Sequence, residues 1–287
     1  MKSVLIVGAF GFLGSHITLS SISTNYKIIL LVKKSSDSYR IPNKFLIKTT
    51  IYYINEIKLK DLYSENDIFL TIISAVRYDS KFKFNIYDTN LLLPLKLIEY
   101  GQSNGCKNYI VFGSFYQKYP KYAQKKDYTL SKTVFRKSVI HKKNIRIFNL
   151  QLEHMYGPKD NRNKFIPWIL DQMKKDEAQI DLTDCIQKRD FIYVNDVVSL
   201  INAIIDKCDE FSCGYHHYEV GTGVSVEIKY FLDLLKKNLN SNSFLNYGVL
   251  PMPKSEIKDS SANLASIPKE LSWQPEYNLT NGIEQIV

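Results

Sequence analysis

Two tyrosines in this chain stand four residues before a lysine: Tyr122 before Lys126, and Tyr128 before Lys132. On a helix this spacing places both side chains on one face. A lysine ammonium there can lower the pKa of the phenol, which could then protonate an alkoxide that develops during hydride transfer. The chain holds 20 tyrosines, so the spacing alone decides nothing. Context favours Tyr128 and Lys132, because a helical sequence follows them directly, whereas Tyr122 lies in a polar, charged connector.

A serine could complete such a site. Ser114 follows the apolar run Tyr109–Phe112, which is typical of a buried strand. At the end of that strand its hydroxyl would bind the carbonyl oxygen of a substrate while Tyr128 supplies the proton. An ordinary turn serine is the alternative. We predict that Ser114, Tyr128 and Lys132 are the catalytic residues.

Three glycines at three-residue spacing follow the apolar run Val4–Val7 near the start of the chain. In a strand–turn–helix unit Gly8 permits the tight turn, Gly11 lets the backbone approach a pyrophosphate, and Gly14 lets the helix pack close to the strand. The phosphates would lie at the helix N-terminus, where free N–H groups and the macrodipole favour negative charge. This pattern indicates a dinucleotide site, with an ordinary strand–helix turn as the alternative.

The residues after the second apolar run, Ile28–Val32, bear on which cofactor is bound. An acidic residue at this place would bind the ribose 2′-hydroxyl and repel a 2′-phosphate. The chain instead has Lys33 and Lys34, followed by two serines. Ammonium groups suit a 2′-phosphate, so we predict NADPH rather than NADH. An exposed basic loop without a ligand is the alternative.

The elements that must position these residues follow from the apolar pattern. Continuous apolar runs such as Ile68–Ala75 and Ile145–Leu150 alternate with amphipathic stretches. This alternation predicts an α/β fold with a doubly wound parallel (Rossmann) sheet and a smaller C-terminal α/β substrate lobe. We expect the dinucleotide-binding domain at residues 1–150, with a returning segment at about 190–210, and the substrate lobe at residues 151–189 and 211–287.

Composition narrows the class of protein further. The 287 residues are 45% hydrophobic, enough for a sizeable core, and no apolar run approaches the ~20 residues of a membrane span. The net charge of +9 is spread along the chain, which favours a basic surface or a phosphate-bearing small molecule over nucleic acid. The four cysteines lack metal-site spacing, and we see no signal peptide, so we expect no metal and a cytoplasmic protein.

Taken together, the glycine loop, Ser114 and the Tyr128/Lys132 pair resemble the extended short-chain dehydrogenase/reductase family, which includes the NAD-dependent epimerases and dehydratases. Further segments agree with the family's motifs: Tyr87–Asn90, His154–Pro158, Lys188–Asp196, Glu219–Gly223 and Leu271–Pro275. Within the family the chain is most similar to 4-ketoreductases of the CDP-paratose and CDP-abequose synthase type. It departs from the family at His154, where an asparagine is usual, and at Phe115 and Tyr116, which replace the acidic pair of a dehydratase.

The resemblance implies NADPH-dependent reduction of the C4 keto group of a nucleotide-linked 4-keto-6-deoxy or 3,6-dideoxy sugar, by a homodimer, for surface polysaccharide biosynthesis. A CDP-linked hexose is favoured, while a GDP-linked sugar, a heptose and the C4 configuration of the product stay open. The alternatives are a nucleotide-sugar 4-epimerase with bound NAD and a non-catalytic Rossmann-fold binding protein.

The resemblance also assigns contacts. The implied cofactor contacts are Gly8, Phe10, Gly11, Phe12, Leu13, Gly14, Lys33, Lys34, Ala75, Asn90, Tyr128 and Lys132. The implied substrate contacts are Ser114, His154, Lys164, Phe165 and Arg189. For Arg189 the alternative is a surface salt bridge with Asp190, and for His154 it is a core histidine whose hydrogen bonds are satisfied within the protein.

Overall fold

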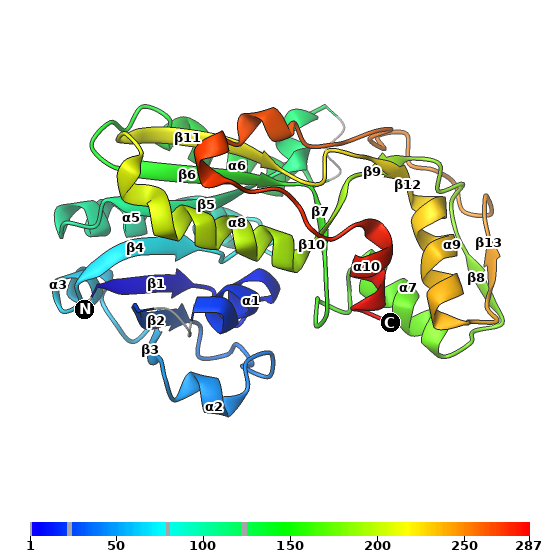
Figure 1. The fold of residues 1–287 in the computed structure, drawn as a ribbon, viewed down its shortest axis with the longest axis horizontal. Helices are drawn as coiled ribbons and strands as arrows, with labels where there is room; N and C mark the ends of the chain where they lie inside the picture. The colour runs from blue at the N-terminus through cyan, green and yellow to red at the C-terminus, as the bar shows by residue number, and fades with distance from the viewer. Residues whose placement is uncertain (1, 22–24, 79–80, 122–124) are drawn as a thin grey trace.

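The computed structural model describes residues 2–21, 25–78, 81–121 and 125–287. At its centre is a seven-stranded parallel sheet in the order β11-β6-β5-β4-β1-β2-β3 (Figure 1). The strands are β1 (Ser3–Val7), β2 (Lys27–Val32), β3 (Thr50–Tyr53), β4 (Ile68–Ile73), β5 (Asn108–Ser114), β6 (Arg146–Leu152) and β11 (Gly214–Val220). The order runs outward from β1 in both directions, so the predicted doubly wound fold is confirmed, and β1 and β4 flank its topological switch point.

The apolar runs are continuous because the sheet is buried on both faces. In β1, Val4 and Ile6 belong to one core and Leu5 and Val7 to the other. The first core includes α1 (Phe12–Ser21) and α8 (Val194–Lys207). The second includes α3 (Leu59–Ser64), α5 (Leu93–Ser103) and α6 (Lys126–Val139). Alternate side chains of each strand therefore pack under a different set of helices.

The two edge strands were not predicted. The residues of β3 are all half-buried, and β11 mixes histidine, tyrosine and glutamate. An edge strand needs no continuous apolar run, so the pattern that marks the central strands is missing there. β11 pairs with β6 and so belongs to the large sheet. The part of the chain that returns to this sheet therefore reaches Val220, beyond the segment expected at about 190–210.

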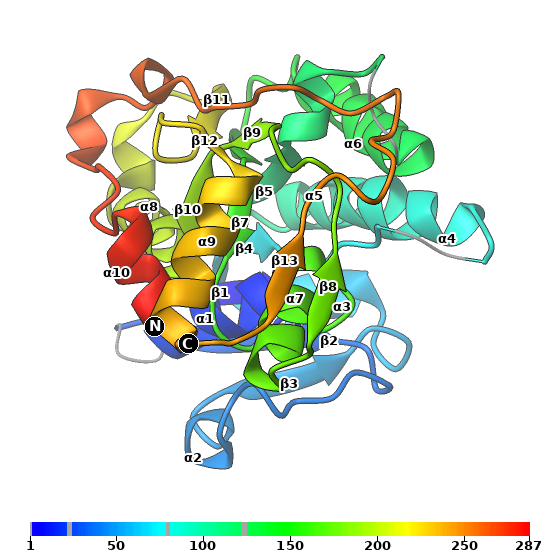
Figure 2. The ribbon, with the colours of Figure 1, turned by 90° about the vertical axis from the view of Figure 1, so that its right-hand side faces the viewer.

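The smaller lobe lies beyond the carboxyl ends of the parallel strands (Figures 1 and 2). Its paired strands are β7 (His154–Tyr156) with β10 (Phe191–Tyr193), β9 (Lys188–Arg189) with β12 (Val226–Glu227), and β8 (Gln179–Asp181) with β13 (Phe244–Asn246). Its helices are α7 (Phe165–Lys174), α9 (Ile228–Leu239) and α10 (Leu279–Glu284). The glycine loop and the smaller lobe thus lie at the same edge of the sheet.

Short elements complete the described chain. They include α2 (Asn43–Leu46), α4 (Phe84–Tyr87), the π-helical turn η1 (Asp88–Leu92) and the 3₁₀ turns η2 (Phe115–Lys118), η3 (Cys208–Glu210), η4 (Leu264–Ser266) and η5 (Lys269–Leu271). Within the described ranges no helix is long and apolar enough to cross a membrane. The four cysteines are free thiols, and three of them are buried.

Candidate active site

The glycine loop joins β1 to α1 with very little space. Gly8 has φ +79°, and a Cβ there would lie 2.7 Å from the backbone N of Ala75. A Cβ on Gly14 would clash with the carbonyl oxygen of Gly8. Both glycines are therefore needed by the protein itself, one for the turn and one for close helix–strand packing.

Gly11 differs from the other two glycines because it is exposed. A Cβ there would meet only the carbonyl oxygen of Gly8, at 3.1 Å. The outer side of the loop is thus open beside the first turn of α1, whose N–H groups have no partner within the helix. An exposed glycine beside these N–H groups and the positive end of the helix dipole fits a dinucleotide pyrophosphate.

The other predicted loop contacts, Phe10, Phe12 and Leu13, are buried in the core beneath the loop. Their side chains are therefore packed inside the protein. Arg40 fastens the loop, because its guanidinium donates to the carbonyl oxygens of Phe10 (3.2 Å) and Lys159 (2.8 Å). Arg40 was not predicted, since it lies 30 residues from Phe10 in the chain and belongs to no motif.

The two lysines after β2 have different surroundings. The Lys34 ammonium is exposed and forms an ion pair with Glu56 at 2.6 Å. Partial burial lowers the pKa of Lys33 and the nearby positive charge of Arg77 lowers it further, while the Asp88 carboxylate opposes this shift. Two cations that repel each other at the carboxyl edge would both be stabilised by an anion between them. Lys33 and Arg77 are thus better candidates for an anion site than Lys34, and Arg77 was not predicted.

Asn90 holds Arg77 in place. Its Nδ2 donates to the carbonyl oxygen of Arg77 (2.8 Å) and to the Ser131 hydroxyl (3.2 Å). Its Oδ1 accepts a hydrogen bond from the Arg77 backbone N–H (2.9 Å). Asn90 is fully buried, so it ties the loop after β4 to α6. A direct contact between Asn90 and the cofactor stays a prediction.

The predicted catalytic residues come together at the carboxyl end of β5. Ser114 is the last residue of β5 and caps η2, while Tyr128 and Lys132 lie one turn apart on α6. The hydroxyls of Ser114 and Tyr128 interact. The Lys132 ammonium donates to the carbonyl oxygen of Phe112, two residues before Ser114, at 2.9 Å. The competing residue, Tyr122, lies outside the described residues.

Burial is the main cause of the pKa shifts of Tyr128 and Lys132. It raises the pKa of the Tyr128 phenol well above its ordinary value, and the hydrogen bond with Ser114 opposes that rise only in part. Burial also lowers the pKa of Lys132 to about 8. We expected Lys132 to lower the Tyr128 pKa, but its ammonium is bound to a main-chain carbonyl and the phenol is dominated by desolvation. Tyr128 consequently holds its proton at neutral pH, which is the form that a proton donor needs.

Two aromatic rings lie beside the Tyr128 ring. The rings of Tyr78 and Tyr128 are 4.9 Å apart, and that of Tyr116 stands edge-on at 6.4 Å. The Lys164 ammonium lies 5.5 Å from the centre of the Tyr78 ring and forms an ion pair with Asp160 at 3.0 Å. A loop of the large domain and the N-terminal end of α7 therefore meet over the candidate catalytic tyrosine. Sequence reasoning missed Tyr78, although its place after β4 at the carboxyl edge could have marked it.

His154 is not a satisfied core histidine. Its ring packs on Phe115 at 4.1 Å, and its Nδ1 is buried without a hydrogen-bond partner among the described residues. Burial lowers its pKa well below the ordinary value, and the positive charges of Arg189 and Lys164 act in the same direction. The imidazole is therefore neutral, and its Nδ1 makes no hydrogen bond within the described residues, although the Glu153 carboxylate lies 4.0 Å away.

Arg189 is also buried, with 4% of its side chain exposed. Its guanidinium pairs with Glu256 and donates to the carbonyl oxygens of Lys188 (2.7 Å) and Ile257 (2.6 Å). The alternative of a surface salt bridge with Asp190 is wrong. That carboxylate instead accepts hydrogen bonds from Thr222, Gly223 and Ala262.

The last predicted contact, Phe165, begins α7 and is partly exposed, with its ring 6.3 Å from that of Trp168. It lies directly after Lys164, on the smaller lobe. In the described parts of the chain no three His, Cys, Asp or Glu side chains gather where they could hold a metal ion.

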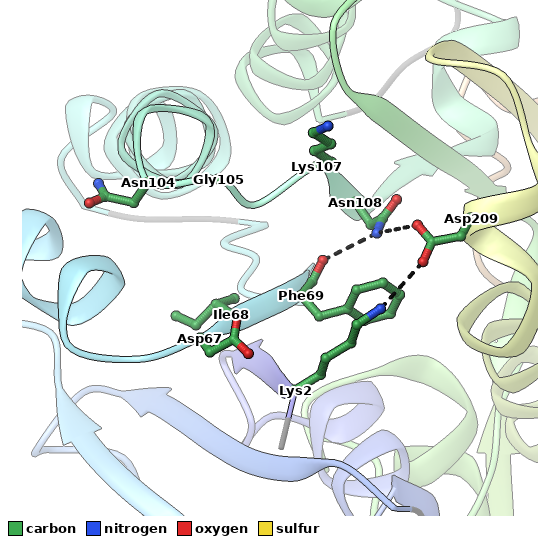
Figure 3. A pocket seen from close by; sticks show the side chains of 9 residues that line it. All are labelled: Lys2, Asp67, Ile68, Phe69, Asn104, Gly105, Lys107, Asn108 and Asp209. Carbon is green, nitrogen blue, oxygen red and sulfur yellow. Dashed lines mark hydrogen bonds and ion pairs between the residues drawn. The ribbon is translucent and has the colours of Figure 1, made fainter.

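A shallow pocket of about 260 Å³ opens at the opposite edge of the sheet (Figure 3). Several of its polar groups pair with one another: Lys2 forms an ion pair with Asp209 at 3.6 Å, and Asn108 donates to the carbonyl oxygen of Phe69 at 3.2 Å. It is lined by the amino ends of β1, β4 and β5, far from the glycine loop. The chemistry-bearing residues are at the carboxyl edge instead.

This fold and this residue set define a class of protein. Residues 4–221 match the NAD dependent epimerase/dehydratase family, so the chain belongs to this family of nicotinamide-dependent enzymes. The predicted resemblance is thereby confirmed.

Particular relatives can also be named. The chain is 33% identical to CDP-abequose synthase of Salmonella muenchen over 297 residues, covering 100% of this chain and 97% of the relative. It is 29% identical to CDP-abequose synthase of Salmonella typhimurium, with 99% and 97% covered. Among solved structures, UDP-N-acetylglucosamine 4-epimerase from Methanobrevibacter ruminantium, in complex with UDP-N-acetylmuramic acid, shares the fold. Its TM-score is 0.82 at 21% identity, with 99% of this chain and 98% of that chain covered.

Proposed function

We propose that the protein is an NADPH-dependent reductase of the C4 keto group of a nucleotide-linked deoxysugar. The favoured substrate is a CDP-linked 4-keto-3,6-dideoxyhexose. The observation that carries the proposal is the buried, protonated Tyr128 beside Ser114 and Lys132, at the edge of the sheet where the glycine loop opens. The full-length similarity to CDP-abequose synthases supports the choice of nucleotide and sugar.

Each residue of the set has a part in the reduction. When bound, the dinucleotide supplies the hydride. Ser114 holds the carbonyl oxygen near the Tyr128 hydroxyl, and Tyr128 gives its proton to that oxygen as negative charge develops. The Lys132 ammonium stabilises the phenolate that Tyr128 becomes. A protonated phenol at neutral pH favours reduction, because it is the proton-donating form.

The smaller lobe would hold the nucleotide diphosphate. The positive charges of Lys164 and Arg189 both act on His154, and each of these cations also pairs with a carboxylate, Asp160 and Glu256 respectively. A diphosphate there accepts hydrogen bonds from cations and stabilises them in turn. We assign Phe165 to the base, since it is partly exposed and follows Lys164. The aromatic rings of Tyr116 and Phe115 suit a sugar that has lost hydroxyl groups.

The preference for NADPH rests on Lys33. It stands at the end of β2, where NAD-dependent proteins carry an acid, and Arg77 lies near it. A 2′-phosphate would relieve the repulsion between these two cations. We assign Lys34 a smaller part, because its ammonium is already paired with Glu56.

Tyr128→Phe tests the proposal. The change removes one hydroxyl and little volume, so folding should survive, while kcat for NADPH oxidation with the CDP-linked keto sugar should fall at least ~100-fold. Tyr122→Phe is the matched control, because it breaks the other Tyr-x-x-x-Lys pair. Loss of turnover in Tyr122→Phe with full activity in Tyr128→Phe would refute the assignment. A 4-epimerase is distinguished by retained NAD and by no net consumption of NADPH.

A further inference from the structure

Arg40 holds the backbone of the glycine loop. Its guanidinium donates a hydrogen bond to the Phe10 carbonyl oxygen at 3.2 Å. The N–H of the next residue, Gly11, donates to the Gly8 carbonyl oxygen at 2.9 Å. Both polar groups of the planar Phe10–Gly11 peptide are therefore engaged, so Arg40 helps to fix the backbone just before the first turn of α1. That turn is the one to which we assigned the dinucleotide pyrophosphate.

The same guanidinium also holds a loop of the smaller lobe, residues 157–164, which follows β7. It donates to the Lys159 carbonyl oxygen at 2.8 Å, and the Lys159 ammonium donates back to the Arg40 carbonyl oxygen at 3.4 Å. Lys159 has φ +64°, a left-handed conformation that residues with a side chain keep only where their surroundings hold them. Arg40 provides one such contact, and His16 provides another, because its Nε2 lies 3.2 Å from the Pro158 carbonyl oxygen.

The 157–164 loop in turn positions Lys164, which we assigned to the nucleotide diphosphate. Asp160 is buried, accepts a hydrogen bond from the Asn161 N–H at 2.7 Å and pairs with the Lys164 ammonium at 3.0 Å. The Lys164 N–H donates to the Asn161 carbonyl oxygen at 2.9 Å, and its ammonium lies 5.4 Å from the centre of the Phe12 ring on α1. The two loops that would bind phosphates are thus joined by one guanidinium.

We propose, on the basis of the reductase function above, that Arg40 is a positioning residue that couples the binding of the dinucleotide to the binding of the nucleotide diphosphate. Either ligand restrains one of the two loops, and Arg40 transmits that restraint to the other. The first ligand then orders both loops, so the second ligand binds more tightly. Linkage requires that each ligand raise the affinity of the other by the same factor. In this role Arg40 touches neither ligand.

Isothermal titration calorimetry measures this coupling without turnover. The Kd of NADPH is determined with and without saturating CDP, and the Kd of CDP with and without saturating NADPH. In the wild type each ligand should lower the Kd of the other by the same factor, at least ~5-fold. Arg40→Met keeps a long side chain and removes its donors, so the factor should fall below about 2. A general weakening of either site would raise both Kd values of a pair and leave their ratio unchanged.

Lys159→Met is the matched control. It removes one positive charge beside the same contact but keeps the Lys159 carbonyl oxygen to which Arg40 donates. Its coupling factor should equal that of the wild type. The inference is overturned if the wild type shows no coupling, if Arg40→Met retains it, or if Lys159→Met loses it as well.

Other ligands separate this inference from the proposed function. If UDP or GDP binds more tightly than CDP, or NADH more tightly than NADPH, the proposed substrate or cofactor is wrong. The same ratio, measured with the ligands that do bind, then still decides the role of Arg40. If the wild type binds none of these nucleoside diphosphates, the proposed function and the coupling both fail.

Discussion

A Lys118→Met substitution should lower the free energy of unfolding by up to about 3 kcal/mol at about pH 7, because it leaves a buried carboxylate without its cation. The Lys118 ammonium lies 2.5 Å from Glu153 and 3.0 Å from Glu219, and it donates to the carbonyl oxygen of Ser261 at 2.7 Å. The Glu153 side chain is 1% exposed and also accepts a hydrogen bond from Ser260 at 2.8 Å. This network ties the 260–263 segment beneath the site.

The magnitude follows from the protonation of Glu153. Burial already raises its pKa above the ordinary value of 4.5, and the attraction of Lys118 opposes that rise. Without Lys118 the folded protein avoids the unpaired charge by keeping Glu153 protonated. At about pH 7 keeping this proton costs about 2.5 pH units at about 1.36 kcal/mol each, or about 3 kcal/mol. This is an upper limit for the effect of the substitution, because the pKa of Glu153 is already raised when Lys118 is present. This limit is at the lower end of the ~3–5 kcal/mol expected for breaking a buried pair, and it corresponds to a fall in Tm of at most about 6–12 °C.

The pKa of Glu153 determines how the stability loss of Lys118→Met changes with pH. In the variant the folded-state pKa of Glu153 lies above the unfolded value, so the folded state binds a proton that the unfolded state releases. Stability is then lost as pH rises above the unfolded pKa, and the penalty should shrink as pH falls from about 7 to about 5. Urea denaturation at several pH values measures it.

Lys34→Met is the matched control. Its ion pair with Glu56 is at a similar distance, 2.6 Å, but both side chains are exposed. The expected loss of stability is much smaller than that for Lys118→Met, because water screens an exposed pair. A penalty for Lys118→Met as small as that of the control, or one that does not change with pH, would refute the reasoning.

Three further predictions concern the site. NADPH should bind at least ~10-fold more tightly than NADH, and Lys33→Asp should narrow the difference; equal wild-type affinities in a direct titration would contradict the assignment. Arg189→Ala should raise KM for the nucleotide sugar with little change in kcat, because a diphosphate contact is made in the ground state and the transition state alike; an unchanged KM in a folded variant would exclude that contact. Since the pKa of Lys132 is about 8, kcat/KM should fall as pH rises through that value and the ammonium is lost; a profile that stays flat well above it would show that this charge is not needed.

Local geometry accounts for what the sequence predicted well. The glycine spacing after β1 specifies a turn and a close helix within seven residues, Gly8–Gly14, and the structure has both. The four-residue separation of Tyr128 and Lys132 specifies one helix face, and both lie on α6. Strands buried on both faces are continuously apolar, so the central strands could be read from the chain, whereas the edge strands β3 and β11 could not.

The sequence by itself thus determined the family, the fold class and the residues that could do chemistry. Only the tertiary structure decided how deeply those residues are buried, which charges they pair with and in which direction their pKa values shift. The raised pKa of Tyr128 comes from burial and from Tyr78, a residue 50 positions away in the chain. The buried Arg189 pairs with Glu256, 67 positions away, and not with its neighbour Asp190. Desolvation and charge pairing depend on everything that packs around a group, and packing brings together residues whose separation in the chain carries no signal.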